Sequence, residues 1–213
     1  MTTGATRTRI KICGITSAEA ARVAAEAGAD AIGLVAVTSS PRSLDDRGAE
    51  AIAASLPPFV ETVRVFQNAA PEELAAWKGR FLQLHGDEDE GFIADIRQWR
   101  PECMIIRGFR FSAEQTLRWA GCRQVHALLV DGSPGGQGEA FDHARLAALM
   151  ERIGKPVILA GGLTAETVGD AIRAVRPYAV DVSSGTESEP GVKDPRLIRA
   201  FCQAVREADR TVY

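Results

Sequence analysis

Short apolar runs alternate with longer amphipathic stretches along the whole chain. Each apolar run is four to eight residues long and is rich in aliphatic and β-branched side chains, which predicts strands buried on both faces. The predicted strands lie in RIKIC (9–13), DAIGLVAV (30–37), FVETVRVF (59–66), FLQLHG (81–86), CMIIRGF (103–109), VHALLVDG (125–132), PVILAGG (156–162) and YAVDVSSG (178–185).

The stretches between these runs have the spacing of helices. In SAEAARVAAEAGA (17–29), Ser17 is placed to cap a helix whose alanine and valine side chains share one face. PEELAAW begins with proline, which favours the first position of a helix. Further helices are predicted near 46–55, 88–99, 112–119, 142–152, 164–175 and 194–207.

Eight strand–helix pairs account for almost the whole sequence, and no change in composition marks a second domain. Buried parallel strands separated by helices are typical of α/β folds. Eight such units favour a closed (β/α)8 TIM barrel, an α/β single-domain fold. A doubly wound open sheet is the alternative fold that this pattern leaves open.

Composition and charge narrow the classes of function. The 213 residues are 46% hydrophobic and 25% charged, as in ordinary globular proteins. A net charge of −3 provides no basic field, so neither nucleic acid nor an anionic membrane is an expected partner. No apolar run approaches the roughly 18 to 20 residues that span a bilayer. If the substrate is an anion, local groups and not the overall charge must hold it.

The N-terminus and the cysteines bear on domain limits and location. Residues 1–8 are polar and lack the apolar middle of a signal peptide, so they are expected to form a frayed leader before a catalytic barrel over 9–213. The four cysteines are far apart and form no CxxC motif, which favours reduced thiols in a cytoplasmic protein. A monomer or a homodimer is expected.

Two reactive side chains end predicted strands, and in a barrel of this class the chemistry lies where strands end. Cys13 ends the first strand, and Asp131 ends the sixth. A thiolate can act as a nucleophile or proton acceptor, and a partly buried carboxyl group can donate a proton near neutral pH. The alternatives are a core cysteine and a carboxylate that caps the following loop.

The loops after the seventh and eighth predicted strands have the composition of a phosphate site. Gly161 and Gly162 let backbone N–H groups approach a ligand, and Ser183, Ser184 and Gly185 offer hydroxyl and further N–H groups. A short helical turn after Gly185 would direct its positive end inward. Barrels frequently bind phosphate between these two loops, although a Gly-Gly pair also serves plain tight turns.

Two other strand-end residues are candidates for substrate binding. Arg42 follows the second strand in SSPR, and its planar guanidinium suits a carboxylate or phosphate. His85 ends the fourth strand, where it either lines the site or closes a turn. His126 is expected inside the sixth strand with a structural role, and the glycine-rich segment 135–138 is expected to close over a ligand.

Several motifs together carry a resemblance to a known family. KICGIT, SPR, VFQN, QLHGDE, LLVDG followed by GGQG and FDH, LAGGLTAETV, and VDVSSGTE followed by PGVKD occur in order between residues 9 and 200. In this order they resemble the N-(5'-phosphoribosyl)anthranilate isomerases of tryptophan biosynthesis. KICGIT combined with VDVSSG and a trailing PGVKD is the most specific part of the match.

The resemblance implies an Amadori rearrangement that needs neither metal nor cofactor. It assigns Cys13 as general base and Asp131 as general acid, and Arg42 as the contact of the anthranilate carboxylate. It places the phosphosugar's phosphate at Gly161, Gly162, Ser183, Ser184 and Gly185, and the ribose portion near Asp181. Residues 36–39 depart from the family, which usually has an aromatic residue, proline and lysine there. A metal-dependent pentose-phosphate epimerase and a non-catalytic phosphometabolite-binding barrel are the competing hypotheses.

Overall fold

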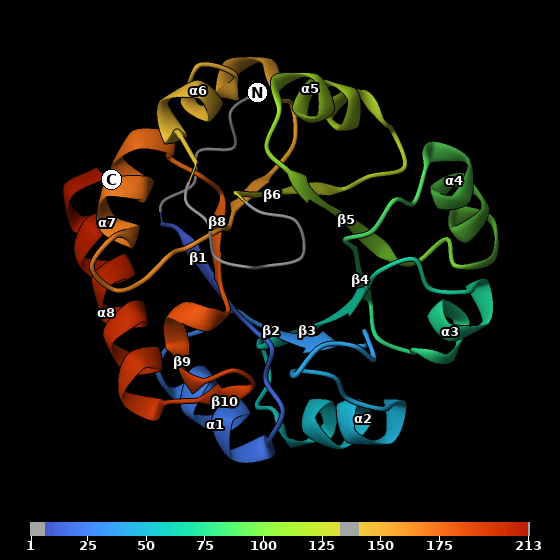
Figure 1. The fold of residues 1–213 in the computed structure, drawn as a ribbon, viewed down its shortest axis with the longest axis horizontal. Coiled ribbons are helices and arrows are strands. Elements are labelled where there is room, and N and C mark those ends of the chain that lie inside the picture. Colours follow the sequence, from blue (N-terminus) through green and yellow to red (C-terminus); the bar gives the residue numbers. More distant parts are fainter. Residues whose placement is uncertain (1–6, 133–140, 213) are drawn as a thin grey trace.

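The computed structural model describes residues 7–132 and 141–212. Its eight parallel strands close into a barrel in the order β1-β2-β3-β4-β5-β6-β7-β8, as the sequence predicts, and the open-sheet alternative is wrong. Figure 1 shows this ring of strands with the helices around its outside. The strands are β1 (Arg9–Cys13), β2 (Ala31–Val35), β3 (Glu61–Phe66), β4 (Phe81–Leu84), β5 (Met104–Arg110), β6 (Ala127–Asp131), β7 (Val157–Leu159) and β8 (Ala179–Val182).

Helices follow the strands in turn and cover the outer face of the sheet. They are α1 (Ala18–Glu26), α2 (Asp46–Ser55), α3 (Pro71–Ala76), α4 (Glu90–Trp99), α5 (Ala113–Gly121), α6 (His143–Ala147), α7 (Val168–Val175) and α8 (Pro195–Val212). The short 3₁₀ helices are η2 (Met150–Arg152) and η3 (Ser184–Thr186). In α1 the Ser17 hydroxyl accepts a hydrogen bond from the Ala20 N–H, which is the predicted cap.

Several predicted boundaries are wrong. The predicted helix over 142–152 is split into α6 and η2, and α7 begins at Val168 and not at 164. Helix α8 continues to Val212 because its buried stripe extends through Ala208. His126 precedes β6, where its Nδ1 accepts a hydrogen bond from the Ile105 N–H, and this contact supports the structural role expected for it.

The end of the expected leader is attached to the barrel. The Thr8 N–H donates to the Asp209 carboxylate on α8, and Arg7 pairs with Asp30 at 2.5 Å. Thr8 is buried, so residues 7 and 8 are not frayed. Residues 1–6 lie outside the described residues, as does the loop segment 135–138.

Two apolar layers hold the barrel together. The larger lies between the strands and the helices, where β1 contributes Ile10 and Ile12. The smaller one fills the barrel interior and includes Val63, Leu129 and Ile158. Because successive strand residues point to opposite faces, Ile10 and Ile12 face the helices while Lys11 and Cys13 face the interior. Within residues 7–132 and 141–212, no helix combines the length and apolar character that crossing a membrane requires.

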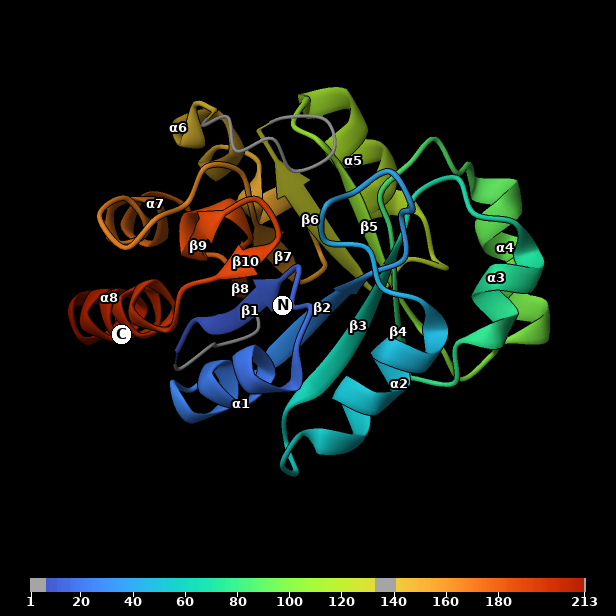
Figure 2. The same ribbon diagram turned by 60° about the horizontal axis from the view of Figure 1, so that its bottom comes forward.

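A small hairpin interrupts the pattern between β8 and α8. Its antiparallel strands are β9 (Glu187–Glu189) and β10 (Val192–Lys193), and in Figure 2 they lie next to β8, above α1. The Thr16 hydroxyl donates to the Gly191 carbonyl at 3.1 Å, which ties the hairpin to the loop after β1. A Cβ at Gly191 would collide with the Pro41 carbonyl, so the hairpin also packs closely on the loop after β2.

Candidate active site

A cavity opens where the strands end, and the predicted functional residues lie around it. Its lining contains every predicted site residue except Gly185, along with residues that the sequence reasoning did not select. The predicted residues in the lining are Cys13, Arg42, His85, Asp131, Gly161, Gly162, Asp181, Ser183 and Ser184. Parallel strands bring these side chains together because all eight strands end on the same side of the barrel.

Cys13 and Asp131 reach this cavity from different strands. Cys13 is the last residue of β1 and is 8% exposed, and Asp131 is the last residue of β6 and is 3% exposed. Cys13 packs against Val35 and Val65, so its thiol is held by apolar neighbours on β2 and β3. Cys13 is thus both buried and part of the cavity wall, and the alternative of a core cysteine away from the cavity is wrong.

Two glycines provide the space that the Cys13 thiol and the Arg42 side chain occupy. Gly33 on β2 pairs with Cys13, and an ideal Cβ at Gly33 would lie 2.6 Å from the Cys13 Sγ. Gly14 has a φ of 76°, a left-handed conformation that favours glycine, and a Cβ there would collide with the Arg42 side chain. The backbone at these two positions therefore sets where the thiol and the guanidinium lie.

A buried ion pair lies beside the thiol. The Lys11 ammonium donates to the Asp181 carboxylate at 2.8 Å, and both side chains are less than 10% exposed. Burial works to lower the pKa of Lys11, but the Asp181 carboxylate outweighs it and the net pKa is raised. Burial also raises the pKa of the Cys13 thiol, and the Lys11 ammonium acts against that rise. The thiol is therefore protonated at neutral pH in this structure.

Arg42 is held by an acidic residue of the β9–β10 hairpin. Its Nε and Nη2 each donate to a carboxylate oxygen of Glu187 at 2.7 Å. Lys193 donates to the same carboxylate at 3.0 Å and to the Ser183 carbonyl at 2.8 Å. Burial works to raise the pKa of Glu187, but these two cations outweigh it and the net pKa is lowered. Glu187 therefore remains ionised and fixes the Arg42 guanidinium at the cavity.

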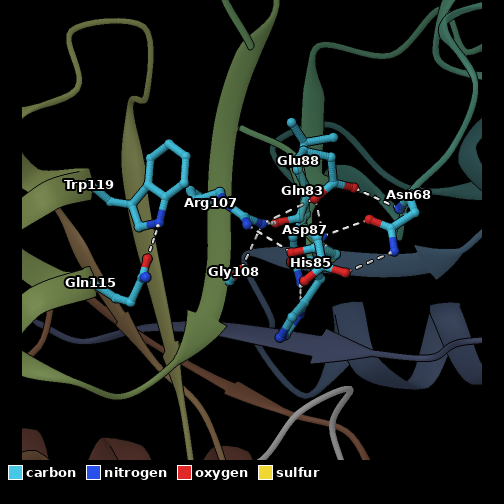
Figure 3. Close-up of polar contacts among 11 residues, drawn as sticks. Asn68, Gln83, His85, Asp87, Glu88, Arg107, Gly108, Gln115 and Trp119 are labelled. Atoms are coloured by element: carbon cyan, nitrogen blue, oxygen red, sulfur yellow. Dashed lines mark hydrogen bonds and ion pairs between the residues drawn. The ribbon is translucent and has the colours of Figure 1, made fainter. Parts of the chain in front are cut away.

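The loop that carries His85 is fastened by a polar network, which Figure 3 shows. Glu88 accepts hydrogen bonds from the Asn68 and Gly86 N–H groups at 2.8 and 2.9 Å. Arg107 donates to the Glu88 carboxylate at 3.2 Å and to the Gly86 carbonyl at 2.8 Å. These bonds connect the loops after β3 and β4 to β5, so His85 stands on a fixed backbone.

The His85 ring is oriented from below by Gln83. Gln83 lies two residues before His85, on the same side of the strand, and its Nε2 lies 3.2 Å from the His85 Nδ1. The His85 Nε2 is buried and has no hydrogen-bond partner among the described residues. Burial lowers the pKa of His85 to about 4, so the ring is neutral at neutral pH. A neutral ring that accepts at Nδ1 presents an N–H donor at Nε2.

The loops after β7 and β8 form the wall where phosphate binding is predicted. Gly161 and Gly162 have φ values of 94° and 62°, conformations that glycine adopts without strain. The Ser183 hydroxyl is buried and has no hydrogen-bond partner among residues 7–132 and 141–212. The helical turn η3 begins at Ser184 and contains Gly185, so the prediction that the turn follows Gly185 is wrong.

Gly185 has a packing role. A Cβ at Gly185 would collide with the Leu163 carbonyl, so this glycine allows the loop after β8 to touch the loop after β7. Gly185 is not among the residues that line the cavity, and a contact of its backbone with phosphate stays a prediction.

Comparisons with known proteins agree with this arrangement. The family model for N-(5'phosphoribosyl)anthranilate (PRA) isomerase matches residues 10–204. An N-(5'-phosphoribosyl)anthranilate isomerase of Pseudomonas putida is 49% identical over 209 residues, which cover 94% of this chain and 98% of that protein.

The chain belongs to this isomerase family.

Solved structures of PRA isomerases have the same fold. The enzyme of Thermus thermophilus superposes with a TM-score of 0.84 at 36% identity, and the match covers 94% of this chain and 99% of that one. A second PRA isomerase superposes with a TM-score of 0.81 at 35% identity, with the same coverage. That protein was solved in complex with reduced 1-(o-carboxyphenylamino)-1-deoxyribulose 5-phosphate.

The site contains polar residues that the sequence did not identify as functional candidates, although the sequence resembles the PRA isomerases. Lys11 and Gln83 are polar residues two positions before Cys13 and His85, so strand alternation places them on the inner face. This two-residue spacing could have identified both residues as candidates that face the barrel interior. Glu187 and Lys193 belong to the TE and PGVKD parts of the family motif, but no local pattern shows that they pair with each other or with Arg42.

The segment that departs from the PRA isomerase family also reaches the cavity. Val37 of the departing segment 36–39 lines it beside Arg42, together with Ser40, which belongs to the SPR motif that matches the family. Among the described residues, no group of three or more His, Cys, Asp or Glu side chains is placed to hold a metal ion.

Proposed function

We propose that the protein converts N-(5'-phosphoribosyl)anthranilate into 1-(2-carboxyphenylamino)-1-deoxyribulose 5-phosphate in tryptophan biosynthesis. Family membership supports the reaction, and a relative of the same fold binds a reduced form of this product. The observation that carries the proposal is that Cys13 and Asp131 end different strands of one barrel and line one cavity with the β7 and β8 loops.

In this proposal Asp131 is the general acid and Cys13 the general base. Asp131 donates a proton to the furanose ring oxygen, the bond from that oxygen to C1' breaks, and the anthranilate nitrogen forms an iminium with C1'. Cys13, as thiolate, removes the proton from C2', and the resulting enolamine tautomerises to the ketone by gaining a proton at C1' and losing the proton of its C2' hydroxyl. Two protons are added to the substrate and two are removed, with no change of oxidation state overall, so this mechanism calls for no metal ion or cofactor.

The other residues of the cavity hold the substrate in this orientation. The phosphate of the phosphosugar binds the backbone N–H groups of Gly161 and Gly162 and the Ser183, Ser184 and Gly185 segment. Arg42 binds the anthranilate carboxylate. Asp181 and the His85 Nε2–H contact the ribose portion. These roles agree with the left-handed glycines, and with the Ser183 hydroxyl and His85 Nε2, which have no hydrogen-bond partner within the described part of the chain.

The test is turnover of enzymatically generated phosphoribosylanthranilate, followed as loss of its fluorescence in the presence of a chelator. We expect chelator-insensitive turnover by the wild type. Cys13→Ala and Asp131→Asn should each reduce kcat by about 10²-fold or more, the range that general acid–base groups contribute. Circular dichroism spectra like that of the wild type serve as the control for folding.

Three outcomes would contradict the proposal. Unchanged kinetics of Asp131→Asn would remove this residue from the mechanism. Turnover abolished by the chelator would favour a metal-dependent enzyme. Binding of the product without any turnover would identify a non-catalytic barrel.

A further inference from the structure

A buried lysine of the first strand is not explained by substrate binding. Lys11 is 3% exposed and lies outside the cavity lining, one layer below Cys13 on the inner face of β1. Barrel interiors are normally filled by aliphatic side chains, and the interior cluster here includes Val63, Leu129 and Ile158. A buried ammonium is costly unless it is paired, so its presence at this position calls for a reason.

The partner of Lys11 fixes where its charge lies. Lys11 pairs in register with Asp181 on the neighbouring strand β8, and its Nζ donates to the Asp181 carboxylate at 2.8 Å. A four-carbon side chain is normally flexible, but this one is anchored at both ends inside a packed barrel. The ammonium is therefore held inside the barrel at the Asp181 carboxylate, in the layer below the one that contains Cys13.

The charges around the sulfur come from several elements. Asp181 faces it from β8, Lys193 from β10 and Arg42 from the loop after β2. Lys193 and Arg42 share the Glu187 carboxylate, which offsets much of their charge. Cys13's apolar neighbours on β2 and β3, Val35 and Val65, supply no charge. Among these groups, Lys11 is the one that lies on the same strand as Cys13 and on the same inner face of it.

We propose that Lys11 is a positioning residue, whose ammonium, anchored by Asp181, stabilises the anionic sulfur of Cys13 from beneath. It does not touch the substrate. Its role follows from the order of groups Asp181, Lys11 and Cys13 on adjacent strands, and from the apolar surroundings in which a thiolate would otherwise form. The inference rests on the proposed role of Cys13 as general base.

The thiol titration tests this role without using turnover. Cys13 can be alkylated by iodoacetamide over a range of pH and quantified in its tryptic peptide, which is Ile12–Arg22 in the wild type and Ile10–Arg22 where Lys11 is replaced by methionine; neither contains another cysteine. We expect Lys11→Met to slow alkylation at pH 8 by about tenfold or more. A positive charge near the sulfur increases the fraction of Cys13 that is thiolate, and removing that charge from a buried site lowers this fraction strongly. Lys11→Arg, which keeps the charge, should restore most of the rate.

Asp181 provides the second half of the test. Asp181→Asn removes a negative charge near the sulfur and releases Lys11, so alkylation should be faster than in the wild type. The double variant Lys11→Met/Asp181→Asn has neither charge, and its rate should lie between those of the two single variants. If Lys11 only fills space, Lys11→Met would be alkylated with the pH dependence of the wild type and the double variant with that of Asp181→Asn, and that result would overturn the inference.

Turnover is measured separately, so that the two proposals can fail independently. Lys11→Met should lower kcat by about tenfold or more and leave KM within about threefold, since the base and not the binding groups is affected. If Lys11→Met slows alkylation while Cys13→Ala retains full turnover, Lys11 acts on the thiol but Cys13 is not the base. If Lys11→Met unfolds, Lys11→Arg and the double variant carry the comparison.

Discussion

Replacing Gly33 by alanine tests whether the position of the Cys13 sulfur controls the reaction. Gly33 lies opposite Cys13 on β2, and an added Cβ would be 2.6 Å from the sulfur and 2.9 Å from the Cys13 Cα. Nonbonded carbon atoms normally approach to about 3.5 to 4.0 Å, so the two strands or the thiol must shift by about 1 Å. No atom that belongs to the substrate site is removed.

The expected effect on catalysis is larger than the effect on stability. A displacement of about 1 Å at a reacting group costs about 10²-fold in rate, so kcat should fall by this factor. Overpacking by one methyl group in a tightly packed core costs about 1 to 3 kcal/mol of unfolding free energy. Steady-state kinetics at 25 °C and urea denaturation of the same preparations measure the two effects.

Gly121→Ala is the matched control. Gly121 is the last residue of α5, and a Cβ there would meet no heavy atom within 4 Å. Alanine at this position should leave kcat unchanged and alter the unfolding free energy by no more than about 1 kcal/mol. Should Gly33→Ala lose the expected stability yet turn over at the wild-type rate, the exact place of the sulfur would not matter, and the role of Cys13 as base would be refuted.

Two further predictions concern Arg42 and His85. Arg42→Ala should raise KM more than it lowers kcat in the fluorescence assay, because a carboxylate anchor binds substrate and transition state alike; the opposite pattern would mean that Arg42 acts on the chemistry. The pKa of His85 is about 4 in the folded protein and about 6.5 in an unfolded chain, so the unfolded state takes up this proton first and stability is lost as pH falls from 6.5 towards 4. Between pH 7 and pH 5 this loss is at most about 2 kcal/mol, and His85→Gln should flatten the pH dependence of the unfolding free energy by this amount; an unchanged slope in urea titrations would contradict it.

The sequence was sufficient to place the candidate catalytic pair because of how parallel barrels are built. Cys13 and Asp131 are far apart in the chain, but each is the last residue of an apolar run. Once eight such runs are assigned to one closed barrel, their ends must meet at one rim. Only the order of strands and helices is needed for this conclusion, and errors of a few residues in the helix boundaries do not affect it.

Pairings across the barrel could not be predicted in the same way. Lys11 and Asp181 are separated by 170 positions, and Arg42 and Glu187 by 145. Which side chains meet depends on the register of adjacent strands and on the path of the β9–β10 hairpin, and neither leaves a periodic signal. The alternation in RIKIC does place Lys11 on the inner face, but it cannot show whether the lysine has a partner there.

The Arg42–Glu187 pair leaves room for a carboxylate ligand because of the geometry of the guanidinium. A guanidinium has five N–H groups in a planar fork, and Glu187 takes the Nε and one Nη2 donor on one edge. The Nη1 group and the second Nη2 hydrogen form the other edge, which can bind a second carboxylate with two hydrogen bonds. Because Lys193 also neutralises Glu187, that carboxylate can hold Arg42 in place without cancelling its charge entirely. In the proposed function, Glu187 therefore orients Arg42 for the anthranilate carboxylate, and the hairpin that carries Glu187 is expected to complete the substrate site.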